Sequence, residues 1–120
     1  MKIAVTAKSN TLDSEVDSRF GRAGYFLLYD TASGGLTAVD NSVNYNASQG
    51  AGVQSAGRIT GLDAGVLITG HCGPKAYSVL ARSGIRIFLC SAPVSVREAI
   101  TLFENDKLKE ASTSDVEGHW

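Results

Sequence analysis

The chain has 120 residues, of which 43% are apolar and 19% are charged, and its formal net charge is −1. This length and this balance fit a single folded domain and exclude a disordered chain. The nearly neutral charge also argues against a broad basic surface for nucleic acid, so any anion site would have to be built locally.

The apolar segments are all too short for a signal peptide or a membrane span, which predicts a cytoplasmic protein. The two cysteines, Cys72 and Cys90, form no Cys-x-x-Cys pair and are too few for a disulfide scaffold. Reduced thiols are the simplest interpretation. Cys90 closes an apolar strand, whereas Cys72 lies in a glycine loop, where a purely structural role is less evident.

Hydrophobic patterns predict five strands and three helices, the composition of an α/β fold. The expected strands cover residues 3–7, 25–30, 36–41, 64–69 and 85–90. The expected helices cover residues 50–62, 74–83 and 96–103. The small residues of segment 31–35 are typical of a hairpin turn, which makes the third strand antiparallel to the second. We therefore expect a five-stranded mixed sheet with strand 2 antiparallel.

Local signals place the ends of two of these helices. Pro74 is favoured at the first helical position, and Gly84 tolerates the left-handed conformation that ends many helices. Ser95, followed by Glu98 three residues later, forms the pattern of a capping box at the start of the last helix.

The topology brings the glycine-rich loops to one edge of the sheet. If the second strand is antiparallel to the first, the polar segment 8–24 lies at the carboxyl end of the first strand. Right-handed crossovers make the fourth and fifth strands parallel to the first, so their exit loops lie at the same edge. Because ligands of open α/β sheets bind at this edge, we expect segments 19–22, 50–53 and 70–75 to form one site.

The chemistry expected at this edge suits an anion. Three helices begin there, each with N–H groups that lack an intrahelical partner and with a partial positive charge. Lys75 is unusual in a first helical turn, because the helix dipole disfavours a cation there by roughly 0.3–1 kcal/mol, and a bound anion would reverse that cost. A solvated surface lysine is an equal alternative. Arg19 and Arg22 could face the same anion, or could pair with an acidic residue of segment 13–17.

His71 and Cys72 are borderline and soft ligands that suit copper or zinc. A hydrogen-bonded structural histidine and a structural thiol are the alternatives. No pair of carboxylates is placed as a two-metal nuclease requires, and the glycine motifs match neither a dinucleotide fingerprint nor a P-loop. These patterns favour binding over catalysis.

Several motifs occur in register along the chain: Leu12-Asp13-Ser14, Arg19-Phe20-Gly21-Arg22-Ala23, Asn41, Gly50-Ala51-Gly52-Val53-Gln54-Ser55-Ala56, Thr69-Gly70-x-x-Gly73-Pro74-x-Ala76, Gly84-Ile85 and Val96-Arg97-Glu98-Ala99-Ile100. With these motifs the chain resembles the dinitrogenase iron–molybdenum cofactor biosynthesis family over residues 1–108. The resemblance implies a three-layer ribonuclease H-like fold. It also implies a protein that carries or delivers a metal–sulfur cluster without catalysing a reaction.

Within this family, the segment Gly70-His71-Cys72-Gly73-Pro74-Lys75 and the ending 115–120 look similar to those of the orange proteins of sulfate-reducing bacteria. Orange proteins hold a molybdenum–copper sulfide anion, two thiomolybdate units bridged by copper, largely non-covalently. Many family members have Asn where this chain has Lys75. An added cation suits an anionic cluster.

The resemblance and the edge prediction together assign the site residues. The expected metal ligands are His71 and Cys72. The expected cluster-binding residues are Arg19, Phe20, Gly21, Arg22, Gly50, Ala51, Gly52, Val53, Gly70, His71, Cys72, Gly73, Pro74 and Lys75.

We therefore expect residues 1–108 to form a single cluster-binding domain, followed by a polar tail, 109–120. The expected function is non-catalytic carriage, storage or delivery of an anionic metal–sulfur cluster, and the resemblance implies a molybdenum–copper sulfide cluster. Two alternatives stay open: a ribonuclease H-like enzyme acting on phosphorylated or nucleic-acid substrates, and a regulatory module for a P-loop ATPase. A P-loop ATPase or another cluster-handling protein is the expected partner, without nucleic acid or a membrane.

Overall fold

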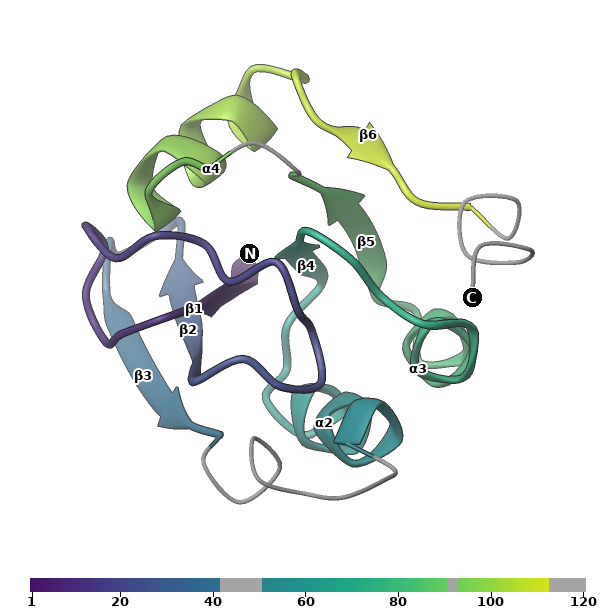
Figure 1. Cartoon of the computed structure of the whole chain (residues 1–120). Helices are drawn as coiled ribbons and strands as arrows, with labels where there is room; N and C mark the ends of the chain where they lie inside the picture. The colour runs from purple at the N-terminus through teal and green to yellow at the C-terminus, as the bar shows by residue number, and fades with distance from the viewer. Residues whose placement is uncertain (42–50, 91–92, 113–120) are drawn as a thin grey trace.

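The computed structural model describes residues 1–41, 51–90 and 93–112 and shows a mixed sheet with helices on both faces (Figure 1). The strands are β1 (Lys2–Ala7), β2 (Tyr25–Asp30), β3 (Leu36–Asp40), β4 (Val66–Thr69), β5 (Arg86–Leu89) and β6 (Lys109–Glu110). The helices are α2 (Ala51–Thr60), α3 (Pro74–Arg82) and α4 (Val96–Glu104). The predicted helices and strands are therefore present in this part of the chain, with ends shifted by up to two residues.

The sheet has the strand order β3-β2-β1-β4-β5-β6. Strand β1 is parallel to β4, and β4 is parallel to β5, as right-handed crossovers require. Strand β2 is antiparallel to both β1 and β3, as the hairpin prediction stated. The carboxyl ends of β1, β4 and β5 thus share one edge.

The prediction of five strands was wrong by one, because β6 pairs antiparallel with the end of β5. Glu110 also holds the guanidinium of Arg86 at 2.8 Å. Ala111, next in the chain, is only 8% exposed. The folded part of the chain therefore extends beyond residue 108, where the sequence prediction had placed the start of a tail.

Side chains alternate between two hydrophobic cores, one on each face of the sheet. Ala4 and Leu67 pack toward α2 and α3, whereas Ile3 and Ile68 pack toward α4. Figure 1 shows the same arrangement, with α4 on one side of the sheet and α2 and α3 on the other. Burial of Leu67 and Ile68, each 0% exposed, stabilises the fold by about 1.5–3 kcal/mol per side chain. Strands buried on both faces explain the unbroken apolar run of β4.

The helix ends follow the predicted signals. Gly84 has φ = +79°, and the Ile85 N–H closes the end of α3 by donating to Leu80 O at 3.1 Å. Ser95 Oγ accepts the N–H of Glu98 at 3.1 Å and caps α4. The first cap fixes where β5 begins, and the second fixes where α4 begins at the carboxyl edge of the sheet.

Candidate functional site

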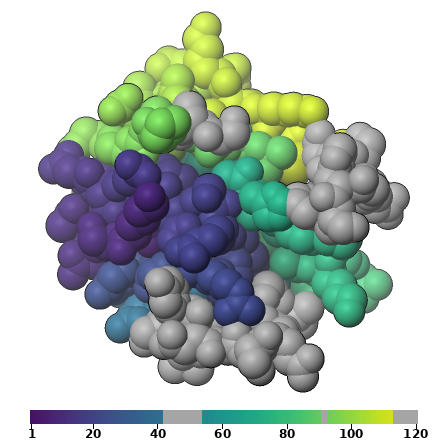
Figure 2. Space-filling model, viewed as in Figure 1, coloured from purple at the N-terminus to yellow at the C-terminus, as the bar shows by residue number. Residues whose placement is uncertain are grey.

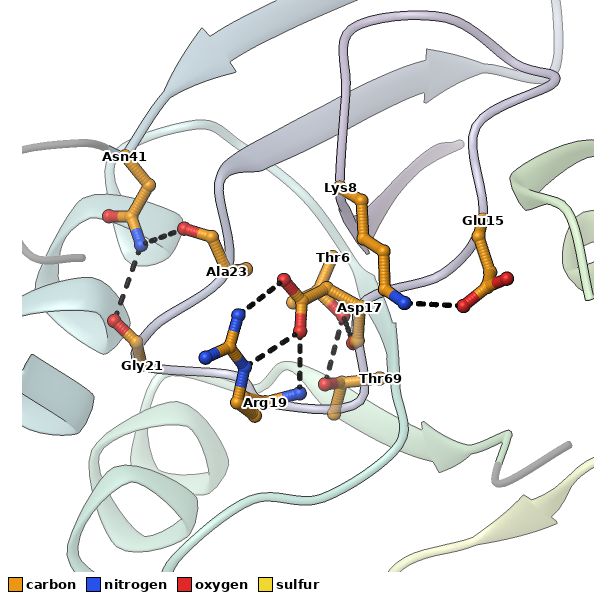
Figure 3. A network of polar contacts seen from close by, with 9 residues as sticks. All are labelled: Thr6, Lys8, Glu15, Asp17, Arg19, Gly21, Ala23, Asn41 and Thr69. Carbon is orange, nitrogen blue, oxygen red and sulfur yellow. Dashed lines mark hydrogen bonds and ion pairs between the residues drawn. The ribbon is translucent and has the colours of Figure 1, made fainter. Parts of the chain in front are cut away.

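Residues 8–24, here called the rim loop, cross the carboxyl edge of the sheet and are anchored to the strand ends. The Asp17 N–H donates to Thr6 O at 2.9 Å, and Thr6 Oγ1 donates to Asp17 O at 2.6 Å. The Thr6 hydroxyl also lies 3.0 Å from that of Thr69, so β1, β4 and the rim loop meet at one buried point (Figure 3). Neither threonine is among the predicted site residues. Their polarity at the ends of otherwise apolar strands was the available signal.

The rim loop lies against residues 70–73, here called the β4–α3 loop. The Phe20 N–H donates to His71 O at 3.2 Å, and Arg19 and His71 form an isolated parallel bridge. Gly70 permits this approach, because a Cβ built there would lie only 2.8 Å from Ser18 Cα. In Figure 2 the purple and blue atoms of the rim loop lie on the visible face beside teal atoms. The predicted convergence of segments 19–22 and 70–75 is confirmed.

A buried amide joins α2 to the same region. Asn41 is 0% exposed, and its Nδ2 donates to Ala23 O at 2.8 Å and to Gly21 O at 3.3 Å. Ser55 of α2 donates to the same Gly21 carbonyl at 3.2 Å. The start of α2 is therefore held next to the rim loop.

The third predicted segment, 50–53, is only partly within the described residues. Ala51, Gly52 and Val53 form the first turn of α2, whereas Gly50 lies outside the part of the chain that the structure describes. The cluster-binding roles of these four residues stay predictions.

The helix α4 does not offer free amides, and this part of the prediction was wrong. The Val96 N–H donates to Ser14 O at 2.8 Å, and the Arg97 N–H donates to Leu12 O at 2.9 Å. The Glu98 N–H is taken by Ser95 Oγ. Because the rim loop and the cap satisfy these three donors, α4 has no first-turn N–H left for an anion.

The start of α3 has the opposite character. In residues 1–41, 51–90 and 93–112, the N–H groups of Gly73, Lys75 and Ala76 have no hydrogen-bond acceptor, and Gly73 supplies no side-chain cap. The first turn contains no acidic residue. Lys75 is exposed and forms no ion pair with any described residue. This end of α3 therefore combines open donors with one cation, which is what an anion requires.

Phe20 and Cys72 lie on the core side of their loops, contrary to the prediction that they line the site. Phe20 is 2% exposed, and its ring centroid lies 5.6 Å from that of Phe26. Cys72 is 1% exposed and packs in the core between the sheet and α2 and α3. Desolvation raises the pKa of the Cys72 thiol to about 12. The thiol is therefore protonated and buried in the core, a state that does not suit the metal-ligand role predicted for it.

The burial of Cys72 predicts a loss of stability in alkali. The Cys72 thiol has a pKa of 9.0 in the unfolded chain and of about 12 in the folded protein. Its contribution to the free energy of unfolding is therefore fully present below pH 9. That contribution falls as the pH rises toward 12. At pH 10.5 we expect a loss of about 2 kcal/mol relative to pH 8. Urea unfolding of the wild type and Cys72→Ala at both pH values measures it, and the same decline in both proteins would contradict the assignment.

His71 is exposed at the rim, and its backbone carbonyl is tied to the rim loop by the Phe20 N–H. Partial desolvation lowers the pKa of His71 below its usual 6.5, so the imidazole is neutral at pH 7. A neutral imidazole is the form that binds copper or zinc. Of the two predicted metal ligands, His71 is therefore the one in a suitable state.

Within the described residues, no three His, Cys, Asp or Glu side chains gather closely enough to hold a metal ion. The donors at the start of α3 are backbone amides and the Lys75 ammonium, and the His71 imidazole lies next to them in the chain. This set fits a preformed anion better than a bare cation that must be chelated. It also gives no support to a carboxylate-based nuclease site. None of the described helices has the length and apolar character to cross a membrane.

Comparisons with known proteins show what the chain is similar to. The family profile "Dinitrogenase iron-molybdenum cofactor" matches residues 1–106. The apo form of the orange protein from Desulfovibrio gigas superposes with a TM-score of 0.89 at 39% identity, with 92% of each chain covered. The solution structure of a putative NifB protein from Thermotoga gives 0.79 at 29% identity, with 91% of each chain covered. An uncharacterised protein of Methanocaldococcus jannaschii is 31% identical over 92% of this chain and 91% of its own length.

Proposed function

The chain belongs to the dinitrogenase iron–molybdenum cofactor family, and from this premise we propose that it binds a preformed anionic metal–sulfur cluster without catalysing a reaction. The observation that carries the proposal is the start of α3, where three N–H groups lack an acceptor among the described residues and Lys75 has no ion-pair partner there. Open donors and a cation at a solvent-accessible helix end stabilise negative charge. Carriage, storage and delivery all need this property.

We propose that the cluster is a molybdenum–copper sulfide, two thiomolybdate units bridged by copper. The 39% identity to the orange protein supports this choice, as does the cationic Lys75. His71 would contact the copper through its neutral imidazole. Cys72 is left out of the proposal because its sulfur is buried.

Reconstitution tests the proposal directly. The purified full chain is mixed anaerobically with tetrathiomolybdate and a copper salt and is then desalted. We expect a coloured species that is retained with a fixed ratio of molybdenum, copper and protein. A protein that emerges colourless and metal-free would contradict the proposed function.

Lys75 is expected to contribute to retention of the cluster. Lys75→Ala removes the cation at the start of α3 and should weaken tetrathiomolybdate binding by about three- to tenfold, since one exposed charge acts through partly screened solvent. Lys107→Ala is the matched control, because Lys107 is also exposed but follows α4. Titration followed by absorbance compares the two, and equal affinities would remove Lys75 from the site.

We propose that the three-layer arrangement, with its antiparallel β2, belongs to the ribonuclease H-like folds. We also propose a cytoplasmic location and a P-loop ATPase or another cluster-handling protein as the partner. The enzymatic alternative gains no support from the described residues, since no three His, Cys, Asp or Glu side chains gather there closely enough to hold a metal ion.

A further inference from the structure

The rim loop contains a cation, Arg19, whose charge is compensated by a buried carboxylate. Asp17 is 2% exposed, and its carboxylate accepts the Arg19 N–H at 3.0 Å, Nε at 3.2 Å and Nη2 at 3.3 Å (Figure 3). The Arg19 side chain is 54% exposed, so the pair lies with the carboxylate inside and the guanidinium outside. The three contacts fix both the backbone and the side chain of Arg19.

Turning the Arg19 side chain toward a ligand would break its ion pair with Asp17. If the guanidinium left, a buried carboxylate would remain without its counter-charge, which is strongly unfavourable. Asp17 is itself held by the hydrogen bonds between its backbone and Thr6. The ion pair is therefore a fixed part of the rim.

Asp17 occupies an edge of the guanidinium that is suited to binding oxyanions. Nε and Nη2 form one of the two planar edges, here called the fork, with which arginine recognises carboxylates, phosphates and other oxyanions in a bidentate way. Oxygen anions accept such hydrogen bonds well, whereas sulfur is a weak acceptor. An arginine with a free fork beside the β4–α3 loop would thus favour oxyanions over sulfide anions.

We propose that Asp17 is a positioning residue that sets the ligand specificity of the rim, by occupying the Arg19 fork and so disfavouring oxyanions relative to thioanions. The inference rests on the proposed function and deepens it. Arg19 lies beside the β4–α3 loop, since it forms a backbone bridge with His71. A site that must select a thiometallate among abundant sulfate, phosphate and molybdate needs such discrimination against oxygen.

Molybdate and tetrathiomolybdate test the proposed specificity directly. Both are tetrahedral dianions of molybdenum, and they differ only in having oxygen or sulfur atoms around the metal. Binding of each to the full chain is measured by calorimetry for the wild type, Asp17→Asn, Arg19→Gln and the double variant. Asp13→Asn is the matched control, since Asp13 holds Arg97 at 3.3 Å on an exposed surface with the Asp13 side chain 83% exposed.

The wild type should prefer tetrathiomolybdate at least about tenfold. Asp17→Asn releases the fork and should raise molybdate affinity by about tenfold, while tetrathiomolybdate affinity rises by about threefold or less. Asp13→Asn should leave both affinities unchanged. The double variant should restore the wild-type preference, and Arg19→Gln should not increase molybdate binding.

An unchanged preference in Asp17→Asn, or a preference in the double variant that differs from the wild type, would overturn the inference. If Asp17→Asn does not fold, the double variant decides. The wild-type preference for tetrathiomolybdate in that variant supports the inference, whereas loss of tetrathiomolybdate binding overturns it, because Arg19 would then contact the ligand itself. A wild type that binds no tetrathiomolybdate at all would instead contradict the proposed function. The two failures are therefore distinguishable.

Discussion

Gly70→Ala is expected to destabilise the protein by about 3 kcal/mol and to weaken tetrathiomolybdate binding at least about tenfold. A Cβ at this position would lie 2.8 Å from Ser18 Cα and 3.1 Å from Ser18 O, so the obstacle is backbone. A flexible side chain could rotate away, but the rim loop is fixed by its hydrogen bonds to β1. The two loops must therefore separate, and the contact between Phe20 and His71 is lost with them.

Urea unfolding and anion titration of the same variant measure both effects. Gly65→Ala is the control, because a Cβ at Gly65 meets nothing within 4 Å and this glycine lies at the other end of β4. We expect Gly65→Ala to bind tetrathiomolybdate as the wild type does. If Gly70→Ala bound with wild-type affinity, the close approach of the two loops would have no part in the site.

Asn41→Ala is expected to cost about 3 kcal/mol of stability. The substitution removes the donor for two backbone carbonyls, Gly21 O and Ala23 O, and leaves a small void at a position that is 0% exposed. Ser55 can still satisfy Gly21, but no other hydrogen bond replaces the one to Ala23 among the contacts described. An unsatisfied buried polar group costs about 1–3 kcal/mol, and the lost packing adds to it.

Asn105→Ala provides the comparison for Asn41→Ala. Asn105 also donates its side-chain amide to a carbonyl, Thr101 O at 3.0 Å, but it is exposed at the end of α4. Its loss should change stability by less than about 0.5 kcal/mol. Thermal and urea unfolding compare the two variants. Similar losses in both would mean that the Asn41 amide does not hold the rim loop in place.

The sequence was sufficient to predict the relative directions of the strands and the meeting of the edge loops. Apolar runs located β1, β4 and β5, and the handedness of crossovers then determined which loops share an edge. The helix caps were also predictable from the sequence, because Ser95 and Gly84 act through contacts with residues only a few positions away. Features that depend on local spacing or on chain topology were therefore predictable.

Side-chain direction in the irregular loops was not predictable in the same way. Segments 17–22 and 70–73 have no periodicity, so nothing in the sequence indicated that Phe20 and Cys72 turn inward. The sequence allowed Arg19 to pair with an acidic residue of segment 13–17, and the path of the rim loop selects Asp17. The strand β6 was missed because Lys109 and Glu110 have little strand propensity, and tertiary pairing outweighs it.

The rim loop completes the hydrogen bonding of α4 and leaves only α3 open among the helix starts whose first turns are fully described. A ligand at the start of α3 would be bound on one side only, and its other side would face solvent. A recipient protein could then take over that exposed side while the donor amides still hold the first. Handover would need no opening of either hydrophobic core, so loading and release could proceed with the fold intact.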